Sequence, residues 1–289
     1  MIPTMNSALT QSQLESFFSN GYIKIPAIVP PSLLGRLRSL FDELMYKQPD
    51  PTASAILQKN GKDYVTNLEQ LCIKGDLACL ELLGSPFLLE IAEYICGTDF
   101  FLIQEFAVIK NLGDKLPVLW HQDMVHQRSG NCFTVGVYLD DVKEGDGALR
   151  IVPGSHLSGK DVCESSREPF IEIPMEAGGI LIHDMMLAHS SEPLQKNKLR
   201  RVIYFEFLSA TQVLGEKIYG RELLINRMQL IHAAIHYYNQ LHPGEKGFHW
   251  KNDIACSIEP ITDLKQRLND IYSISVHARP SAYCLEQLQ

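Results

Sequence analysis

The sequence lacks the features of several large protein classes. No stretch approaches the roughly 18 consecutive apolar residues of a membrane-spanning helix, and the first residues show no basic stretch followed by an apolar one. Basic residues are also few: 26 Lys and Arg stand against 34 Asp and Glu, for a formal net charge of -8. We therefore expect neither a nucleic acid nor a membrane as a partner.

Cysteine pairs with metal-site or redox spacing are missing as well. The seven cysteines are widely spaced, and their odd number does not suggest a disulfide framework. They are Cys72, Cys79, Cys96, Cys132, Cys163, Cys256 and Cys284. We expect them to be reduced thiols in a cytoplasmic protein.

Internal repeats and low-complexity tracts are absent, which excludes repeat architectures. What remains is ordinary in composition: 289 residues, 45% hydrophobic and 21% charged. Such a chain can bury a sizeable core, and its length suits one domain.

The first 98 residues predict helices that would support the rest. Thr10 should cap a helix with Gln13 at its third position, and Gly21 should end it. Further expectations are a strand at 22–25, a helix from Pro31, an irregular loop over 48–66, and helices near 76–83 and 86–96.

Residues 99–210 predict a β-rich core. Short strands begin at Phe100 and are separated by glycine-containing turns, while helices precede and follow them instead of alternating with them. This pattern favours a mainly β fold, a double-stranded jelly roll of the cupin type, with flanking helices. Residues 211–289 would form a C-terminal extension, helical over 221–240, that supports the roll or covers its mouth.

Three residues of this core could bind a metal ion. His121 and Asp123 lie two positions apart, so in a strand their side chains share one face. His189 follows a Gly-Gly turn and an apolar run, and it could complete the set from a distant strand. Two histidines and one carboxylate form the facial triad that binds non-heme Fe(II) and leaves coordination positions open.

Two adjacent arginines follow His189. A guanidinium can hold the carboxylate of a 2-oxo acid through a bidentate, charge-assisted pair of hydrogen bonds. Arg200 and Arg201 both qualify, but strand alternation sends them to opposite faces.

The order of these motifs resembles the phytanoyl-CoA dioxygenase family of Fe(II)/2-oxoglutarate oxygenases. The resemblance rests on His121-x-Asp123, the segment from Gly145 to His156, His189-x-Ser191, and Arg200. It extends upstream to Leu9 and so covers about residues 9 to 210. The family spacing selects Arg200 over Arg201.

The resemblance implies a site and a reaction. Fe(II) would be bound by the triad, and 2-oxoglutarate by Arg200 and Ser191, with Gln104 and Lys110 as further contacts from one strand face. With O2, the co-substrate would give succinate and CO2 while a C–H bond of a small organic metabolite is oxidised, by default through hydroxylation. The oligomeric state is not indicated.

Two alternatives stay open. One is a non-catalytic jelly roll that binds a metal or 2-oxo acid as a sensor or scaffold, and the other is a cupin-type metalloenzyme that needs no 2-oxoglutarate and hence no Arg200. Substrate choice is expected from segments 47–66 and 215–250 acting as lids, with polar groups such as Arg227 and His232 facing the substrate.

Overall fold

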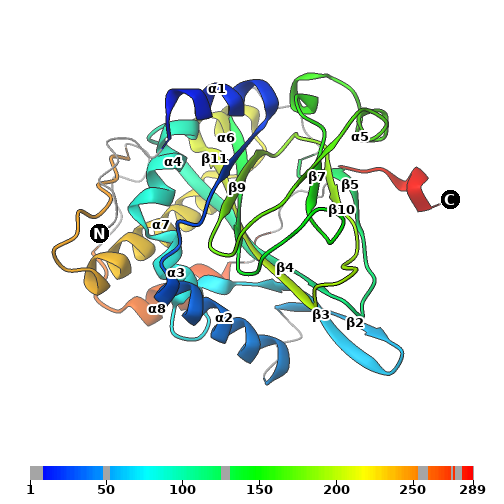
Figure 1. Cartoon of the computed structure of the whole chain (residues 1–289). Helices are drawn as coiled ribbons and strands as arrows, with labels where there is room; N and C mark the ends of the chain where they lie inside the picture. The colour runs from blue at the N-terminus through cyan, green and yellow to red at the C-terminus, as the bar shows by residue number, and fades with distance from the viewer. Residues whose placement is uncertain are drawn as a thin grey trace.

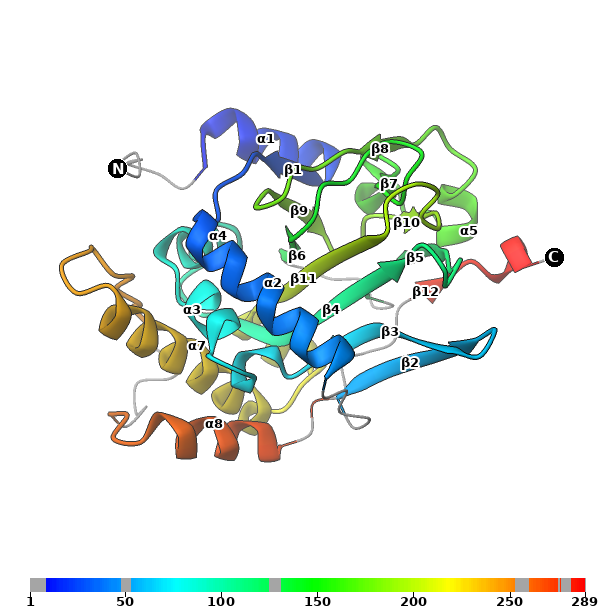
Figure 2. The ribbon, with the colours of Figure 1, turned by 60° about the horizontal axis from the view of Figure 1, so that its bottom comes forward.

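The structure, a computed structural model, describes residues 9–47, 53–124, 131–252, 260–274, 276 and 282–288. Within these residues two sheets face each other, and every strand pair is antiparallel. Helices cover the outer face of the larger sheet (Figure 1; Figure 2). The expected jelly roll with flanking helices is confirmed.

The large sheet has the strand order β1-β9-β6-β11-β4-β3-β2. Its strands are β1 (Tyr22–Ile25), β2 (Ser54–Lys59), β3 (Lys62–Glu69), β4 (Phe100–Asn111), β6 (Cys132–Tyr138), β9 (Ile180–Asp184) and β11 (Leu199–Ser209). The small sheet, ordered β12-β5-β10-β7-β8, contains β5 (Val118–Gln122), β7 (Leu149–Ile151), β8 (Ile171–Ile173), β10 (His189–Ser191) and β12 (Ala282–Tyr283).

The helices come mostly from the two ends of the chain. They are α1 (Gln11–Asn20), α2 (Pro31–Tyr46), α3 (Ala78–Leu83), α4 (Pro86–Cys96), α5 (Val162–Ser165), α6 (Ala210–Glu216), α7 (Arg221–Leu241) and α8 (Leu264–Ser273). Short 3-10 turns lie at Leu71–Ile73, Ser155–Leu157 and Leu285–Leu288. No helix among the described residues is long and apolar enough to cross a membrane.

Strand alternation gives β11 two different faces. Ile203, Phe205 and Phe207 point outward into the main apolar core, where they meet α2 residues such as Leu37 and Phe41. Burying each such side chain contributes about 1.5–3 kcal/mol, so this face fixes the strand against the helices. The residues between them point into the roll, and this inner face carries the site.

The N-terminal expectations are confirmed except for the loop. Thr10 and Gln13 form the reciprocal cap, and Gly21 ends α1 with a φ of 83°. The irregular loop expected over 48–66 is wrong for its described residues, since β2 and β3 form a hairpin there. Asn60 and Gly61 both take positive φ at its tip, and this Asn-Gly signal was available in the sequence.

The C-terminal segment differs from expectation in two ways. A strand, β12, joins the small sheet beside β5, so strands from both sides of residues 99–210 complete the two sheets. Cys163 and Cys284 form a disulfide, so the expectation of reduced thiols is wrong for these two. Cysteine spacing cannot reveal such a pair, because its members are 121 positions apart. Cys72, Cys79, Cys96 and Cys132 are free and buried, and Cys256 lies outside the described residues.

Candidate metal and co-substrate site

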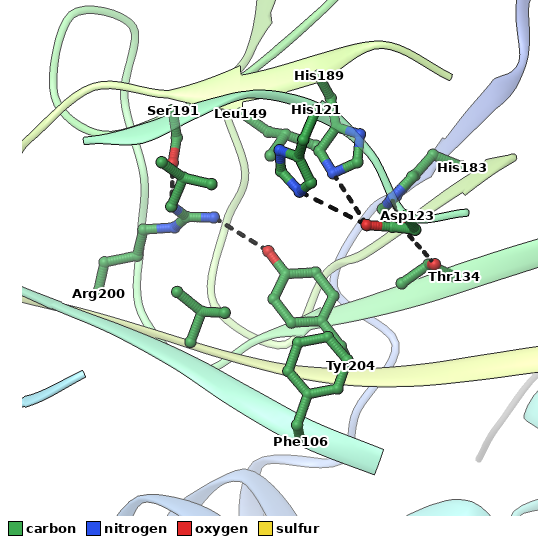
Figure 3. A pocket seen from close by; sticks show the side chains of 12 residues that line it. Phe106, His121, Asp123, Thr134, Leu149, His183, His189, Ser191, Arg200 and Tyr204 are labelled. Atoms are coloured by element: carbon green, nitrogen blue, oxygen red, sulfur yellow. Dashed lines mark hydrogen bonds and ion pairs between the residues drawn. The ribbon is translucent and has the colours of Figure 1, made fainter. Parts of the chain in front are cut away.

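The small sheet brings the three expected ligands together. His121 lies on β5 and His189 begins β10, and the two residues are direct partners across these strands. Asp123 follows the end of β5, and its backbone N–H donates to Met185 O at 2.8 Å. One ligand atom from each residue lies within 4.8 Å of the others, and all three point toward one place (Figure 3).

Backbone hydrogen bonds orient both imidazoles. Nδ1 of His121 lies 2.8 Å from Leu119 O, and Nδ1 of His189 lies 2.8 Å from Leu187 O. With Nδ1 as the donor, Nε2 is left with a lone pair, and each Nε2 lies 3.5 Å from Asp123 Oδ1. Both histidines therefore present the nitrogen that a metal would need.

The charges of these groups also suit metal binding. Burial, with the nearby His121, holds the pKa of His189 well below its usual range, so this imidazole is neutral. Burial alone would raise the pKa of Asp123, but His189, His121 and His183 outweigh it and hold the pKa well below its usual range. The site offers neutral nitrogen and an ionised carboxylate, which are the ligand forms that bind metals.

Two residues of the large sheet fix Asp123 from behind. Thr134 on β6 donates to Asp123 Oδ2 at 2.9 Å, and His183 Nε2 on β9 lies 3.1 Å from the same oxygen. Oδ1 therefore remains turned toward the histidines. Thr134 was missed by sequence reasoning, because nothing in its local pattern shows that β6 lies opposite Asp123.

Arg200 lies inside the roll at the other end of the site. Its side chain is 2% exposed, and it donates to Ser191 Oγ at 3.3 Å and to Tyr204 Oη at 3.2 Å (Figure 3). Its Nε has no acceptor among the described residues. Tyr204 was missed by sequence reasoning, although its even separation from Arg200 on one strand places both on the same face.

A cavity of about 50 Å³ connects the two ends. It is lined by the triad, by His183, Thr134, Ser191, Arg200 and Tyr204, and by the apolar side chains of Phe106, Val108, Val118 and Leu149. The rings of Phe106 and Tyr204 stack with centroids 5.3 Å apart and form one wall. A ligand in this cavity would touch an arginine at one end and the metal ligands at the other.

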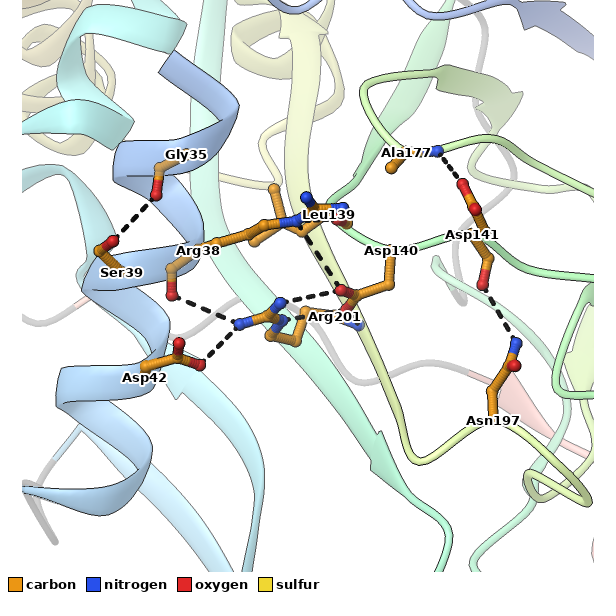
Figure 4. Close-up of polar contacts among 10 residues, drawn as sticks. All are labelled: Gly35, Arg38, Ser39, Asp42, Leu139, Asp140, Asp141, Ala177, Asn197 and Arg201. Carbon is orange, nitrogen blue, oxygen red and sulfur yellow. Dashed lines mark hydrogen bonds and ion pairs between the residues drawn. The ribbon is translucent and has the colours of Figure 1, made fainter. Parts of the chain in front are cut away.

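Arg201 points out of the roll, on the face opposite to that of Arg200. It forms ion pairs at 2.8 Å with Asp140 and with Asp42 of α2, so its partners are acidic residues and not the cavity (Figure 4). This network ties β11 to α2. Arg200 is therefore the arginine that faces the cavity, and its assignment to the co-substrate stays a prediction.

Gln104 and Lys110 occupy the two ends of the inner face of β4. Lys110 is the direct partner of Arg200, and its ammonium donates to Ser191 O at 3.1 Å and Leu116 O at 2.9 Å. Lys110 therefore lies at the same end of the roll as Arg200 and contacts the backbone of Ser191. Gln104 donates to Glu206 Oε2 at 2.7 Å, at the metal end and away from Arg200.

Other sequence candidates do not join the triad. His232 lies on α7, which packs against other helices and β4. Arg227 does not face a substrate cavity: it is buried and pairs at 2.6 Å with Glu105, so that expectation is wrong.

One residue of the C-terminal segment was missed altogether. Tyr283 on β12 stacks on His121, with ring centroids 5.0 Å apart. No signal in the sequence indicates this contact, because the short strand and the disulfide that bring it there are both non-local.

Comparison with known proteins agrees with this geometry. The family model described as phytanoyl-CoA dioxygenase (PhyH) matches residues 17–202. The chain is 24% identical to L-proline trans-4-hydroxylase of Streptomyces griseoviridis over 157 residues, which cover 52% of this chain and 57% of that protein. The chain therefore matches a little over half the length of this curated relative.

Solved structures show the same fold. EvdMO1 has a TM-score of 0.62 and 25% identity, covering 69% of this chain and 50% of the other. EctD from S. alaskensis, crystallised with 2-oxoglutarate and 5-hydroxyectoine, has a TM-score of 0.59 and 18% identity, covering 72% of this chain and 79% of the other.

Proposed function

The chain belongs to the phytanoyl-CoA dioxygenase family, and on that premise we propose that it is an Fe(II)- and 2-oxoglutarate-dependent dioxygenase. Its cofactors would be iron(II), the co-substrate 2-oxoglutarate and O2. Its substrate would be a small organic molecule with an oxidisable C–H bond. The residues of the site support the metal and the co-substrate of this proposal.

The donor set fits iron(II). His121, Asp123 and His189 supply two imidazole nitrogens and one carboxylate from one side, which would leave the opposite side open to a chelating ligand and O2. The backbone carbonyls that hold each Nδ1 keep the rings from rotating away. These three residues would hold the metal.

The observation that carries the co-substrate proposal is a buried arginine without an anion. Arg200 is 2% exposed, and its hydrogen-bond partners among the described residues are the neutral hydroxyls of Ser191 and Tyr204. A buried guanidinium without an anionic partner is costly. The far carboxylate of 2-oxoglutarate would satisfy it, and the buried Nε is one donor still free for it.

The chain's own residues would bind, orient and shield the reactants. Ser191 and Tyr204 hold the guanidinium in place, while Lys110 adds positive charge nearby. Val108, Val118 and Leu149 line the space between the two ends and exclude water from it. Iron(II) with the bound 2-oxo acid and O2 would supply the oxidising chemistry.

Hydroxylation is the outcome we propose. The related L-proline trans-4-hydroxylase is named for that reaction, and the site needs no further catalytic group to perform it. Gln104 remains a proposed site residue. Its hydrogen bond to Glu206 lies at the metal end of the cavity and not beside Arg200.

A cytoplasmic location is also part of the proposal. The disulfide between Cys163 and Cys284 weighs against it, because such bonds persist mainly in oxidising compartments. Thiol alkylation of a fresh cell extract, followed by mass spectrometry of the two peptides, would decide. If the two peptides remain linked in a cytosolic fraction, the disulfide is compatible with a cytoplasmic location.

Anaerobic titration tests the central claim. Adding 2-oxoglutarate to the Fe(II)-loaded protein should produce the visible metal-to-ligand charge-transfer band of the chelate, and admitting O2 should release succinate. Asp123→Ala should abolish both while the circular dichroism spectrum stays unchanged. A wild-type protein that binds Fe(II) but gives no band would contradict the proposal and favour a metal-binding role without 2-oxoglutarate.

A further inference from the structure

A row of four polar residues crosses the inner face of the large sheet. His183, Thr134, Glu206 and Gln104 are successive direct partners on β9, β6, β11 and β4. Directly opposed residues on neighbouring strands share one face, and the first two of the row touch Asp123. Glu206 and Gln104 therefore face the inside of the roll at the level of the metal ligands.

This second half of the row has acceptors to spare. Gln104 Nε2 donates to Glu206 Oε2 at 2.7 Å. Within the described part of the chain, no group donates to the other carboxylate oxygen of Glu206 or to the amide oxygen of Gln104, and Glu206 forms no ion pair there. Glu206 is 3% exposed. Gln104 is half-buried, and two acceptors so placed suit a ligand that brings its own donors.

The pair is separate from the co-substrate end. Arg200 and Glu206 are six residues apart on β11, or roughly 20 Å along a strand, and the stacked rings of Phe106 and Tyr204 lie between them. One end of the roll thus carries Arg200 and Lys110 and the other carries a carboxyl group. The two ends suit ligands of opposite charge.

Beyond the pair, the wall of the roll becomes apolar. A cluster of buried side chains closes this end, and it includes Phe101, Ile103, Met124, Met185 and Leu208, with Leu224 and Met228 of α7 packed against them. A ligand held by Glu206 would rest its remaining surface on this cluster. The ligand that fits this end would therefore carry a cationic group with several N–H donors, attached to an apolar remainder.

From this geometry we propose that Gln104 and Glu206 form the substrate anchor of the dioxygenase, and that the substrate is an amine whose ammonium group binds between their free oxygens. This inference rests on the proposed function, since it assigns the substrate class of the same site. An ammonium group offers two or three N–H donors and balances the carboxylate charge. It would place carbon atoms near the amine beside the metal ligands.

Without a ligand, the surroundings of Glu206 disfavour its ionised form. Burial and the negative charge of Asp123 raise the pKa of Glu206, against a lowering by the hydrogen bond from Gln104. A carboxyl group so placed lacks a counter-charge among the described residues. An ammonium ligand supplies one.

A pair of ring compounds of one size tests the proposal. Cyclohexylamine and cyclohexanol would be titrated calorimetrically, without O2, into the protein loaded with Fe(II) and 2-oxoglutarate. The amine should bind at least roughly tenfold more tightly, the size of a hydrogen-bonded charge interaction. Glu206→Gln should bring the ratio of the two dissociation constants close to one. Glu172→Gln, at the far edge of the small sheet, removes one charge as a matched control and should leave the ratio unchanged.

The outcomes separate this proposal from the one on which it rests. Equal binding of the two compounds by the wild type, or an unchanged ratio in Glu206→Gln, would overturn the amine assignment. In either case a normal charge-transfer band would leave the dioxygenase proposal standing, whereas loss of the band in the wild type would contradict that proposal itself. A thermal melt of Glu206→Gln establishes that the variant is folded, and Gln104→Leu, which keeps the carboxyl, should weaken amine binding by a smaller factor.

Discussion

The ring of Tyr283 lies almost parallel to the imidazole of His121, with centroids 5.0 Å apart and an angle of 13° between their planes. The two residues are direct partners on β12 and β5. The next residue, Cys284, is bonded to Cys163 at the base of α5. The C-terminal segment therefore supports a proposed metal ligand, and a disulfide anchors that segment.

Removing this stacked ring should weaken the metal site. Tyr283→Ala should raise the Fe(II) dissociation constant by roughly two- to tenfold, because stacked aromatic pairs contribute about 0.5–1.5 kcal/mol beyond their burial. Anaerobic Fe(II) titration measures the constant. Tyr283→Phe keeps the ring and should behave as the wild type, so an equal loss in both variants would show that the stacking is not the cause.

Breaking the disulfide should cost stability. Cys284→Ser opens a covalent loop whose two ends are 121 positions apart, and loss of such a crosslink typically lowers the free energy of unfolding by about 2–5 kcal/mol. Denaturant unfolding would measure this. Wild-type protein treated with dithiothreitol should match the variant, and if the reductant changes nothing, the bond does not exist in solution.

His183 should matter for the metal without being a ligand. Its Nε2 lies 3.1 Å from the Asp123 oxygen that faces away from the two ligand histidines. Residues that orient a ligand typically contribute a factor of about 10–100 to metal affinity. His183→Ala should therefore weaken Fe(II) binding by that factor, whereas His189→Ala should abolish it. His232→Ala on α7 is the control. If His183→Ala and His232→Ala weaken Fe(II) binding equally, the cause is a general loss of folding.

The two adjacent arginines should give opposite results. Arg200→Ala should raise the 2-oxoglutarate dissociation constant at least roughly tenfold with little effect on Fe(II) binding. Arg201→Ala should leave that constant unchanged but lower the melting temperature, because it removes the ion pairs to Asp140 and Asp42. A larger co-substrate effect for Arg201→Ala would reverse the assignment of the two faces of β11.

The sequence predicted those features of the site and fold that depend on residues close together in the chain. Strand alternation placed His121 with Asp123 and put Arg200 and Arg201 on opposite faces, while the family resemblance selected Arg200 as the inward one; the structure has the same arrangement. The capping residues of α1 and the strand at 22–25 were equally readable, because caps and short periodic runs depend on neighbours in the chain.

The missed residues depend on contacts between distant segments. Thr134 meets Asp123 and Glu206 only through the pairing of β6 with β11 and the packing of the two sheets. Tyr283 and the disulfide join the last residues of the chain to the middle. Cross-strand register cannot be obtained from one sequence without knowing which strands are neighbours. The hairpin of β2 and β3 is different, since its Asn60-Gly61 turn was a local signal that was overlooked.

Co-substrate binding should weaken as the pH rises through about 7. Burial, with the charge of Arg200, lowers the pKa of Lys110 to about 7; Asp114 and Glu192 act in the opposite direction, and Arg150 lowers it further. A bound dianion favours the charged lysine and raises its pKa, so binding takes up a proton above pH 7. Affinity should be highest below about 7 and fall by at most about tenfold per pH unit above it.

Calorimetry at saturating Fe(II) between about pH 6.5 and 8.5 would reveal this dependence. Lys110→Met should bind 2-oxoglutarate more weakly and with a flatter pH profile. Lys115→Met, which removes the nearby lysine that bonds to Leu194 O, should keep the slope of the wild type. A slope that survives in Lys110→Met would assign the titration to another group.

Arg227 gives the clearest test of whether the middle of α7 is a lid or a support. Its guanidinium is 2% exposed and bonds to Glu105 and to Leu102 O, on the helix-covered face of β4 away from the cavity. Breaking a buried ion pair by removing one partner costs about 3–5 kcal/mol, since the other charge stays buried alone. Arg227→Met should therefore lower the free energy of unfolding by that amount, and the double variant Glu105→Gln/Arg227→Met should recover part of it.

Neither variant should change the 2-oxoglutarate dissociation constant, and hydrogen exchange in the middle of α7 should be the same with and without a bound substrate. If the middle of α7 gains protection from hydrogen exchange only when substrate binds, this part of the helix acts as a lid.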